Sequence, residues 1–403
     1  MSTPLQEAST RRRAPALDVA VVGGGMVGAA AALALALAGF STALLEARAP
    51  TAWSAGDEVD LRVVGLAPSS LALLDDLGVW PSIRAARAGP YAHMHVWDAE
   101  SGAAIDFDAP SEGRELLGYI VENNLVQWTL WQALEAAGVR RLCPAEVKGF
   151  EAREDRIQLE LADGETLAAG LLVAADGAAS PLRQLAGIGT HGRDYAQRAV
   201  VAHVATERSH ENTAWQRFLS SGPLALLPLA DGRSSIVWSL PEAEAQRVLA
   251  LDDATFLNEL GMASDIRLGR IVASTPRAAF PLKLQLAERY QADRFVLLGD
   301  AAHAVHPLAG QGVNLGLRDV AELRDTLLAA RAAGRDIGAE HVLRRYARRR
   351  RSADTLDAMG FDALARIYAW QSPALVAARG LGVRLLDHLA PLKRRIAGHA
   401  AGL

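Results

Sequence analysis

The segment from residue 18 to residue 46 constrains the fold of this chain more than any other. A mostly apolar run, Asp18 to Val22, enters a glycine-rich turn at residues 23–28. An alanine- and leucine-rich stretch then reaches Gly39, and a second apolar run closes at Glu46. This order predicts a strand, a tight turn, a helix and a second strand with a carboxylate at its end. It is the Gly-x-Gly-x-x-Gly pattern of a dinucleotide-binding βαβ unit, which predicts an α/β chain with a Rossmann-like domain.

Each glycine of this pattern has a predicted role. Gly23 allows the turn, Gly25 lets the backbone approach a pyrophosphate, and Gly28 allows the helix to pack closely on the strand. Glu46 lies 18 residues after Gly28 and is predicted to bind the ribose of an adenosine. A second match, at residues 187–192, has neither an apolar strand directly before it nor an apolar helix after it. We therefore predict a loop there and a single dinucleotide site in the chain.

The uncharged part of this segment allows another interpretation, because residues 19–45 are numerous enough to span a bilayer. Three arginines at residues 11–13 precede it, as in a targeting signal. Three observations oppose a membrane anchor. Asp18 stands at the start, the consecutive glycines would weaken a continuous helix, and Glu46 closes the run where a nucleotide-binding unit needs a carboxylate. We favour the βαβ unit.

Residues 299–319 contain the second informative motif. The apolar run Phe295 to Leu298 enters Gly299-Asp300, a turn rich in glycine and proline follows, and a helix is predicted to begin near Asn314. A carboxylate at the end of a strand can hold the hydroxyls of a polyol, and the N–H groups at the start of a helix favour negative charge. These parts suit a flavin, with Asp300 on the ribityl chain and the backbone of residues 310–314 at the pyrimidine edge of the ring.

The third motif follows a predicted strand at residues 171–175. An aspartate-glycine turn begins at Asp176, Ser180 is a suitable helix cap, and Pro181 suits the first helical position. Arg183 would lie in the first helical turn, within reach of a phosphate. Taken alone, these residues also fit an ordinary strand–turn–helix junction. The position of the motif between the other two favours a functional role.

Composition narrows the classes of function. The chain has 403 residues, a formal net charge of −4 and one cysteine, Cys143. These values give no general attraction to nucleic acid, no intramolecular disulfide and no cysteine-rich metal site, and they fit a cytoplasmic protein. His303 and His306 stand three residues apart without a second pair. We therefore predict no metal site, and we expect His303 to hydrogen-bond within its turn rather than to act in catalysis.

The three motifs, in this order, resemble those of the single-component FAD-dependent aromatic hydroxylases of the para-hydroxybenzoate hydroxylase superfamily. Residues 306–319 resemble the signature of the ubiquinone-biosynthesis hydroxylases, and the segments 62–80 and 118–134 are also similar to that family. The resemblance covers most of residues 17–395. It implies FAD as the cofactor, NAD(P)H and O2 as co-substrates, and hydroxylation of a phenolic ring, most simply a prenylated intermediate of ubiquinone biosynthesis.

The resemblance also implies roles for single residues. Arg62 corresponds to an arginine near the flavin, Gln127 to a residue at the FAD diphosphate, and Pro307 to the proline near the flavin carbon that carries oxygen. Arg62 and Pro307 are the predicted catalytic residues. Asp176 and Arg183 match a motif linked to both FAD and NAD(P)H. The predicted cofactor-binding set is Gly23, Gly25, Gly28, Glu46, Arg62, Gln127, Asp176, Arg183, Asp300, Gly310, Gly312, Val313 and Asn314.

The expected architecture is a Rossmann-like FAD-binding domain interwoven with a β-sheet substrate domain, followed by a helical C-terminal segment. The FAD-binding domain is predicted from three pieces, the substrate domain from two, and residues 1–16 are predicted to be a disordered tail. The FAD-binding pieces are 17–89, 115–189 and 286–335; the substrate pieces are 90–114 and 190–285; the C-terminal segment is 336–403. No general base is assigned, although His191, Tyr195 and His203 fall in the substrate domain.

Partners are less constrained. The arginines at 344–345 and 348–351 fit either a solvated helix face or contact with anionic lipid or an acidic partner protein. The apolar segment 363–392 fits either packing on the core or peripheral contact with the inner membrane. Membership of a multi-enzyme quinone-biosynthesis complex is a further expectation, and the oligomeric state stays open. Two rival functions remain: a flavin-dependent hydroxylase of a soluble aromatic, and a flavin-binding structural subunit. A halogenase of this fold is disfavoured because the chain has no Trp-x-Trp-x-x-Pro motif.

Overall fold

The computed structural model describes residues 17–304, 312–369 and 371–402. Its first three elements confirm the βαβ unit that the glycine turn predicts: β1 (Leu17–Val22), α1 (Met26–Leu37) and β2 (Thr42–Leu45). β1 pairs in parallel with β2, with Val22 opposite Leu45. The predicted tail, residues 1–16, lies outside the described residues.

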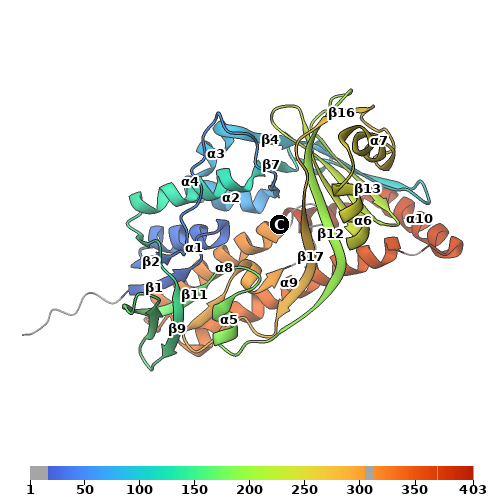
Figure 1. The fold of residues 1–403 in the computed structure, drawn as a ribbon. Helices are drawn as coiled ribbons and strands as arrows, with labels where there is room; N and C mark the ends of the chain where they lie inside the picture. The colour runs from blue at the N-terminus through green and yellow to red at the C-terminus, as the bar shows by residue number, and fades with distance from the viewer. Residues whose placement is uncertain (1–16, 305–311, 370, 403) are drawn as a thin grey trace, which may run out of the picture.

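The first sheet is the centre of the nucleotide-binding half (Figure 1). It runs in the order β18-β19-β11-β1-β2-β8, and the pairs from β19 to β8 are parallel. Carboxyl ends of parallel strands meet at one edge, so the turns after β1, β11 and β19 share that edge. The strands not yet defined are β8 (Arg140–Leu142), β9 (Val147–Ala152), β10 (Ile157–Leu161), β11 (Thr166–Ala174), β18 (Gln291–Ala292) and β19 (Phe295–Leu297).

Helix α1 packs between this sheet and two other helices, α4 (Asn123–Ala136) and α8 (Gly312–Ala332). It carries no charged side chain, as a helix buried on most sides requires. The uncharged stretch at residues 19–45 therefore forms the core of the first sheet, which excludes the membrane-anchor interpretation for this segment. Among the helices that the structure describes, none is both long enough and apolar enough to cross a bilayer.

The second sheet lies beside the first (Figure 1) and runs in the order β20-β17-β12-β15-β14-β13-β5-β6, with β16 paired to β12. One face packs on α6 (Glu242–Leu249) and α7 (Asp253–Ala263) through an apolar cluster that includes Val204 and Phe256. The strands are β5 (His93–Asp98), β6 (Ala104–Asp108), β12 (Thr190–Thr206), β13 (Thr213–Leu219), β14 (Gly222–Pro228), β15 (Ser234–Pro241), β16 (Ile271–Ser274), β17 (Ala278–Ala287) and β20 (His303–Ala304).

Two further groups of elements join the halves. A small sheet of order β3-β7-β4 carries α2 (Pro68–Asp76) and α3 (Trp80–Arg87), and its Ile120 packs against the second sheet. The long helix α9 (Glu340–Ala369) contacts strands of both large sheets, β19 among them. The remaining elements are β3 (Val63–Leu66), β4 (Ala88–Tyr91), β7 (Gly118–Glu122), α10 (Pro373–His388) and α11 (Ala390–Ala401). This mixed α/β architecture with a helical C-terminal segment confirms the predicted fold class.

The second glycine match is where the structure differs most from the sequence prediction. β12 begins at Thr190, so residues 190–192 form a strand rather than a loop. Antiparallel pairing with β17 stabilises this start, and glycine suits position 192 because an added Cβ would lie 2.0 Å from the carbonyl oxygen of Leu284. The predicted absence of a βαβ unit at this match is confirmed, since β12 runs on to Thr206.

Candidate flavin site

The glycine turn after β1 leaves open space at one position only. At Gly23, which has φ +105°, an added Cβ would lie 2.3 Å from the carbonyl oxygen of Ala175, and at Gly28 it would lie 1.9 Å from that of Gly23. At Gly25 no other heavy atom lies within 4 Å of such a Cβ. Gly25 caps α1 without a side-chain hydrogen bond, and the first turn of α1 carries no acidic residue. These features suit the approach of an anion such as a pyrophosphate.

Two polar side chains from other elements hold the turn. Glu46, which follows β2, accepts hydrogen bonds from the backbone N–H of Gly24 and, at 3.0 Å, from the backbone N–H of Arg48. Gln127 of α4 donates from Nε2 to the carbonyl oxygen of Gly24 at 2.8 Å. The fold thus brings both predicted residues to the glycine turn from two different elements. Their contacts with a nucleotide stay predictions.

The Asp300 turn follows β19 and is compact. Gly299 to Ala301 form the short helix η2, and Gly299 has φ +56° and packs against Val27 of α1. The Asp300 side chain is accessible, yet protein surrounds it on most sides. This burial of the carboxyl raises its pKa, while the charges of His303 and Arg62 act in the opposite direction. A reachable carboxylate with protein around it suits the hydroxyls of a polyol.

Helix α8 joins the two turns. An added Cβ at Gly316 would lie 2.5 Å from the Val27 side chain and 3.2 Å from the Cα of Gly299. The start of α1, the Asp300 turn and α8 therefore meet directly. One elongated molecule could reach from Gly25 to Asp300 along the carboxyl edge of the first sheet. The open space at Gly25, the uncapped N–H groups of α1 and the accessible Asp300 together fit FAD.

The start of α8 is fixed by Asn314, whose side chain is fully buried. Its Oδ1 accepts hydrogen bonds from the Ala67 N–H at 2.9 Å and the Ser70 hydroxyl at 2.7 Å, and its Nδ2 donates to the Gly65 carbonyl at 2.8 Å. These bonds tie α8 to β3 and α2. The side chain acts as a strut, so a contact of residues 312–314 with a flavin ring would come from the backbone. Pro307 and Gly310 lie outside the described residues.

The third motif forms the capped helix α5 (Pro181–Leu185), as predicted. Asp176 accepts hydrogen bonds from the Ser180 hydroxyl at 2.6 Å and the Leu182 N–H at 3.1 Å, and Ser180 accepts one from the Arg183 N–H at 3.0 Å. The buried Arg183 guanidinium donates at 2.8 Å to the carbonyls of Ala301 and Ala178. It therefore joins the third motif to the Asp300 turn. Contact of Arg183 with a phosphate stays a prediction.

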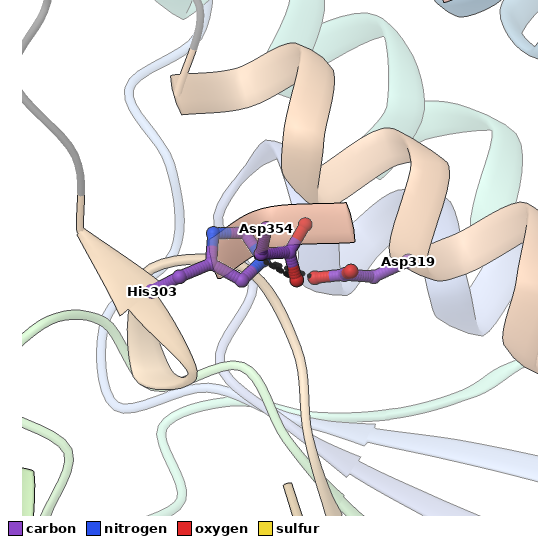
Figure 2. A group of neighbouring side chains, drawn as sticks. All are labelled: His303, Asp319 and Asp354. Atoms are coloured by element: carbon purple, nitrogen blue, oxygen red, sulfur yellow. Dashed lines mark hydrogen bonds and ion pairs between the residues drawn. The ribbon is translucent and has the colours of Figure 1, made fainter. Parts of the chain in front are cut away.

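Behind the Asp300 turn lies a group of buried charges that sequence reasoning found only in part. His303 faces Asp319 and Asp354 (Figure 2), and Arg350 binds both carboxylates. The expectation that His303 hydrogen-bonds within its own turn is wrong for the ring, which contacts α8 and α9 instead. The imidazole of His303 and the carboxylates of Asp319 and Asp354 are close enough together to hold a metal ion. Arg350 already supplies the positive charge there, so we assign no metal.

Arg62 lies near Asp300 but in a different segment, just before β3. Its guanidinium carbon is 6.0 Å from the ring centroid of Phe280 on β17, and its backbone N–H donates to Asp60 at 3.1 Å. The charge of Arg62 lowers the pKa of the Asp300 carboxyl, which places the two side chains within electrostatic reach of each other. The structure therefore brings Arg62, Asp300 and the second sheet to one region.

Fold and site together define a FAD-binding oxidoreductase with an interleaved second sheet. A family model described as FAD binding domain matches residues 16–356. Two solved structures share the fold over 95–96% of this chain and 96% of their own. They are p-nitrophenol 4-monooxygenase PnpA from Pseudomonas putida DLL-E4 (TM-score 0.75, 21% identity) and Klebsiella pneumoniae HpxO complexed with FAD and uric acid (TM-score 0.73, 20% identity).

Full-length relatives narrow the family. The chain is 39% identical to the 3-demethoxyubiquinol 3-hydroxylase of Escherichia coli K12, covering 96% of this chain and 98% of the relative. It is 37% identical to ubiquinone hydroxylase UbiL of Rhodospirillum rubrum (96% and 89%) and 35% identical to the human mitochondrial ubiquinone biosynthesis monooxygenase COQ6 (95% and 92%). The chain belongs to this family of FAD-dependent ubiquinone-biosynthesis hydroxylases, and its cofactor is FAD.

Proposed function

We propose that this flavoenzyme hydroxylates the phenolic ring of a prenylated ubiquinone precursor, with NAD(P)H as electron donor and O2 as co-substrate. The observation that carries the proposal is the alignment with the Escherichia coli 3-demethoxyubiquinol 3-hydroxylase, which spans nearly all of both chains. The elements that build the candidate flavin site all lie within that alignment's length.

The chemistry supplied by bound FAD is electron transfer from NAD(P)H and activation of O2 for hydroxylation of an electron-rich ring. The protein binds and orients the cofactor and the substrate and shields them from water. In this proposal the N–H groups of α1 beside Gly25 hold the pyrophosphate with Gln127 nearby, Glu46 stands at the adenosine end, and Asp300 holds the ribityl hydroxyls. Arg62 contributes positive charge near the ring. Pro307 is assigned to the oxygen-bearing side through the family resemblance alone.

In this proposal the substrate packs against the second sheet at β17. Ala214, Ala225 and Leu227 of that sheet pack with Ile120 of β7 and so hold the second sheet against the small sheet. Phe280, which stands beside Arg62, is 38% exposed and is suited to cover an aromatic ring.

No described histidine is assigned as a general base for the phenol. His203 lies in the predicted substrate domain, but its Nε2 is 3.0 Å from the Asp60 carbonyl oxygen and donates to it. Burial lowers the pKa of its ring, so the imidazole is neutral at pH 7. His191 lies on the exposed start of β12 and is 3.6 Å from Glu288. Neither geometry places a free base beside Arg62 and Asp300.

We further propose peripheral contact with the cytoplasmic surface of the inner membrane through α10 and α11. An exposed apolar stripe runs along these helices, with four basic residues in the same segment: Leu381, Leu385, Leu389, Leu392 and Ile396, with Arg384, Lys393, Arg394 and Arg395. Apolar side chains beside basic ones suit an anionic bilayer. The end of α11 reaches the flavin half, where Arg318 of α8 donates to the His399 carbonyl. Association with other quinone-biosynthesis enzymes remains an additional proposal.

Vesicle flotation tests the membrane contact. The Leu381→Glu, Leu385→Glu double variant should bind vesicles containing anionic phospholipid at least roughly tenfold more weakly, because two exposed leucines that would enter the bilayer are replaced by anionic groups. Met262→Glu is the matched control, because Met262 is 62% exposed on α7 and Leu381 is 60% exposed. Equal flotation of the wild type and the double variant would contradict the contact. A wild type that self-associates through these leucines but does not bind vesicles would contradict it as well.

Turnover measurements test the main proposal. The purified protein should carry the absorption spectrum of FAD, and a prenylated phenol should increase its NAD(P)H consumption severalfold. Mass spectrometry of cells lacking the gene should show accumulation of an under-hydroxylated quinone precursor. Flavin absorption with no stimulation by any phenol would instead favour a structural flavin subunit. Stimulation only by unprenylated aromatics would assign a soluble substrate.

A further inference from the structure

We infer that four buried charged residues, His303, Asp319, Arg350 and Asp354, form a positioning network that holds the Asp300 turn in the shape that FAD requires. This inference rests on the proposed role of Asp300 at the ribityl chain. None of the four is placed to touch the cofactor, so they are positioning residues and not catalytic ones.

Asp319 of α8 is the centre of the network and binds the turn directly. Its Oδ2 accepts a hydrogen bond from the Gly299 N–H at 2.8 Å and from His303 Nε2 at 2.7 Å. Gly299 precedes Asp300, and His303 follows it three residues later. The side chains of Asp319 and His303 are both fully buried. One carboxylate oxygen therefore clamps both ends of the turn that presents Asp300.

Arg350 and Asp354 extend the network to α9. Arg350 donates from Nε to Asp319 Oδ1 at 2.6 Å, from Nη2 to Asp354, and from Nη2 to the Leu315 carbonyl at 3.4 Å. Asp354 Oδ2 lies 3.5 Å from His303 Nε2. Figure 2 shows the three acidic and imidazole side chains meeting between the turn and the two helices. The Asp300 turn, α8 and α9 are thus joined through this group of charged side chains.

Arg183 holds the same turn from the opposite direction, through its bond to the Ala301 carbonyl. The turn is therefore fixed at Gly299, Ala301 and His303, while the Asp300 side chain between them stays accessible. Burying charges costs free energy, and a buried ion pair is often no more stabilising than apolar residues of similar size. Several such pairs converging on one turn fit a requirement for an exact backbone shape better than a requirement for stability.

The chain provides a matched control for this distinction. Asp98 of β5 and Arg379 of α10 form another buried pair, with Nε to Oδ2 at 2.8 Å and Nη2 to Oδ1 at 2.9 Å. This pair joins the second sheet to the C-terminal helices, away from the Asp300 turn. Loss of either carboxylate leaves a buried arginine with fewer partners, so both changes should lower thermal stability. Only the change in the network should alter flavin binding.

The experiment compares Asp319→Asn, Asp98→Asn and Asp300→Ala in the full chain. FAD affinity is measured by fluorescence titration of the flavin-free protein, the asymmetry of the bound ring by visible circular dichroism, and stability by thermal unfolding without FAD. Asp319→Asn should raise the Kd for FAD about tenfold or more and change the dichroism of the flavin bands. Asp98→Asn should lower the Tm but leave the Kd within about twofold.

A second variant covers a failure of Asp319→Asn to fold. His303→Gln keeps a donor toward Asp319 but removes the charge, and it should raise the Kd less than Asp319→Asn does. If Asp300→Ala weakens FAD binding while Asp319→Asn and His303→Gln behave like Asp98→Asn, the network is merely structural and the inference is overturned. An unchanged Kd in Asp300→Ala would instead overturn the proposed role of Asp300 and, with it, the inference.

Discussion

At the scale of single residues, the three glycines of the turn after β1 differ in the space around them. Gly23 and Gly28 lie against backbone carbonyls, so that a Cβ has no room. Gly25 differs because nothing lies within 4 Å of an added Cβ. The close packing at Gly23 and Gly28 therefore serves the fold, while the open space at Gly25 is the space proposed for the pyrophosphate.

This difference gives a prediction that separates folding from binding. Gly25→Ala should leave the Tm of the flavin-free protein within about 2 °C of the wild type. It should raise the Kd for FAD roughly tenfold, because the added methyl group occupies space proposed for the pyrophosphate. Gly28→Ala should destabilise the protein itself, since its Cβ would meet a carbonyl oxygen. Equal loss of stability in the two variants would contradict the distinction.

The pH dependence of stability is a second prediction at this scale. Burial alone would lower the pKa of His303, but the charges of Asp319 and Asp354 outweigh it and raise the pKa to about 9. A His pKa raised in the folded state adds stability that is fully present below the ordinary value of 6.5 and is lost as the pH rises through about 9. Burial also raises the pKa of Asp354 from 3.8 to about 7. Its contribution to stability therefore also falls as the pH rises, but between about pH 4 and pH 7.

Chemical unfolding of the flavin-free protein at several pH values measures this effect. The free energy of unfolding should fall between pH 7 and pH 10, and His303→Gln should flatten that fall. The groups that face the imidazole are Asp319, Asp354 and, through both carboxylates, Arg350; Tyr290 lies beside it with ring centroids 6.0 Å apart. An identical pH slope in wild type and variant would show that His303 does not titrate in this range.

At the scale of secondary-structure elements, helix α8 fixes the position of the Asp300 turn relative to α1, β3 and α2. Gly316 lets it approach α1, Asp319 binds the Asp300 turn, and Asn314 ties it to β3 and α2. Each attachment reaches a different neighbour, so the helix is fixed in direction as well as in position.

Removing the Asn314 strut should therefore cost stability. Asn314→Leu leaves the Ala67 N–H and the Gly65 carbonyl buried without their present partner, and each such group costs about 1–3 kcal/mol. We expect a loss of about 2–5 kcal/mol in chemical unfolding of the flavin-free protein. Asn314→Asp, which keeps the acceptor for Ala67 and Ser70 but loses the donor to Gly65, should lose less. A loss below about 1 kcal/mol for Asn314→Leu would contradict the strut.

Local patterns predict the elements well, and the contacts between them poorly. The first βαβ unit and the Ser180 cap of α5 are confirmed because neighbouring residues determine them. The partners of His303 could not be read in the same way. Asp319, Arg350 and Asp354 lie 16 to 51 residues further along the chain, and only packing of α8 and α9 on the sheet brings them together. The four-residue spacing of Arg350 and Asp354 is a sequence signal for an ion pair on one helix face. The neighbouring arginines make this signal hard to recognise, because several of them could form such a pair.

The start of β12 and the side chain of Arg183 show the same limit. Pairing with β17 makes a strand of residues 190–192, although their glycine content disfavours one. Arg183 stands in the first turn of α5, as its position predicts, but the adjoining Asp300 turn offers it a carbonyl oxygen. The domain boundaries and the contacts of the site residues with FAD remain predictions.

At the scale of the whole molecule, the two large sheets meet where Arg62, Phe280 and Asp300 come together, while α9 spans both. A flavin ring held at the Asp300 turn would then lie near Phe280 of β17 in the second sheet. The two large sheets lie side by side in Figure 1. The proposed membrane surface on α10 and α11 contacts the nucleotide-binding half where Arg318 of α8 donates to the His399 carbonyl.

An experimental structure of the protein with FAD bound tests the central claim most directly. The account predicts one continuous FAD molecule along the carboxyl edge of the first sheet, with its adenosine at Glu46, its pyrophosphate at Gly25, its ribityl chain at Asp300 and its ring beside the backbone of residues 312–314. FAD density that reaches the glycine turn but leaves Asp300 more than a hydrogen bond away from every ribityl hydroxyl would contradict it.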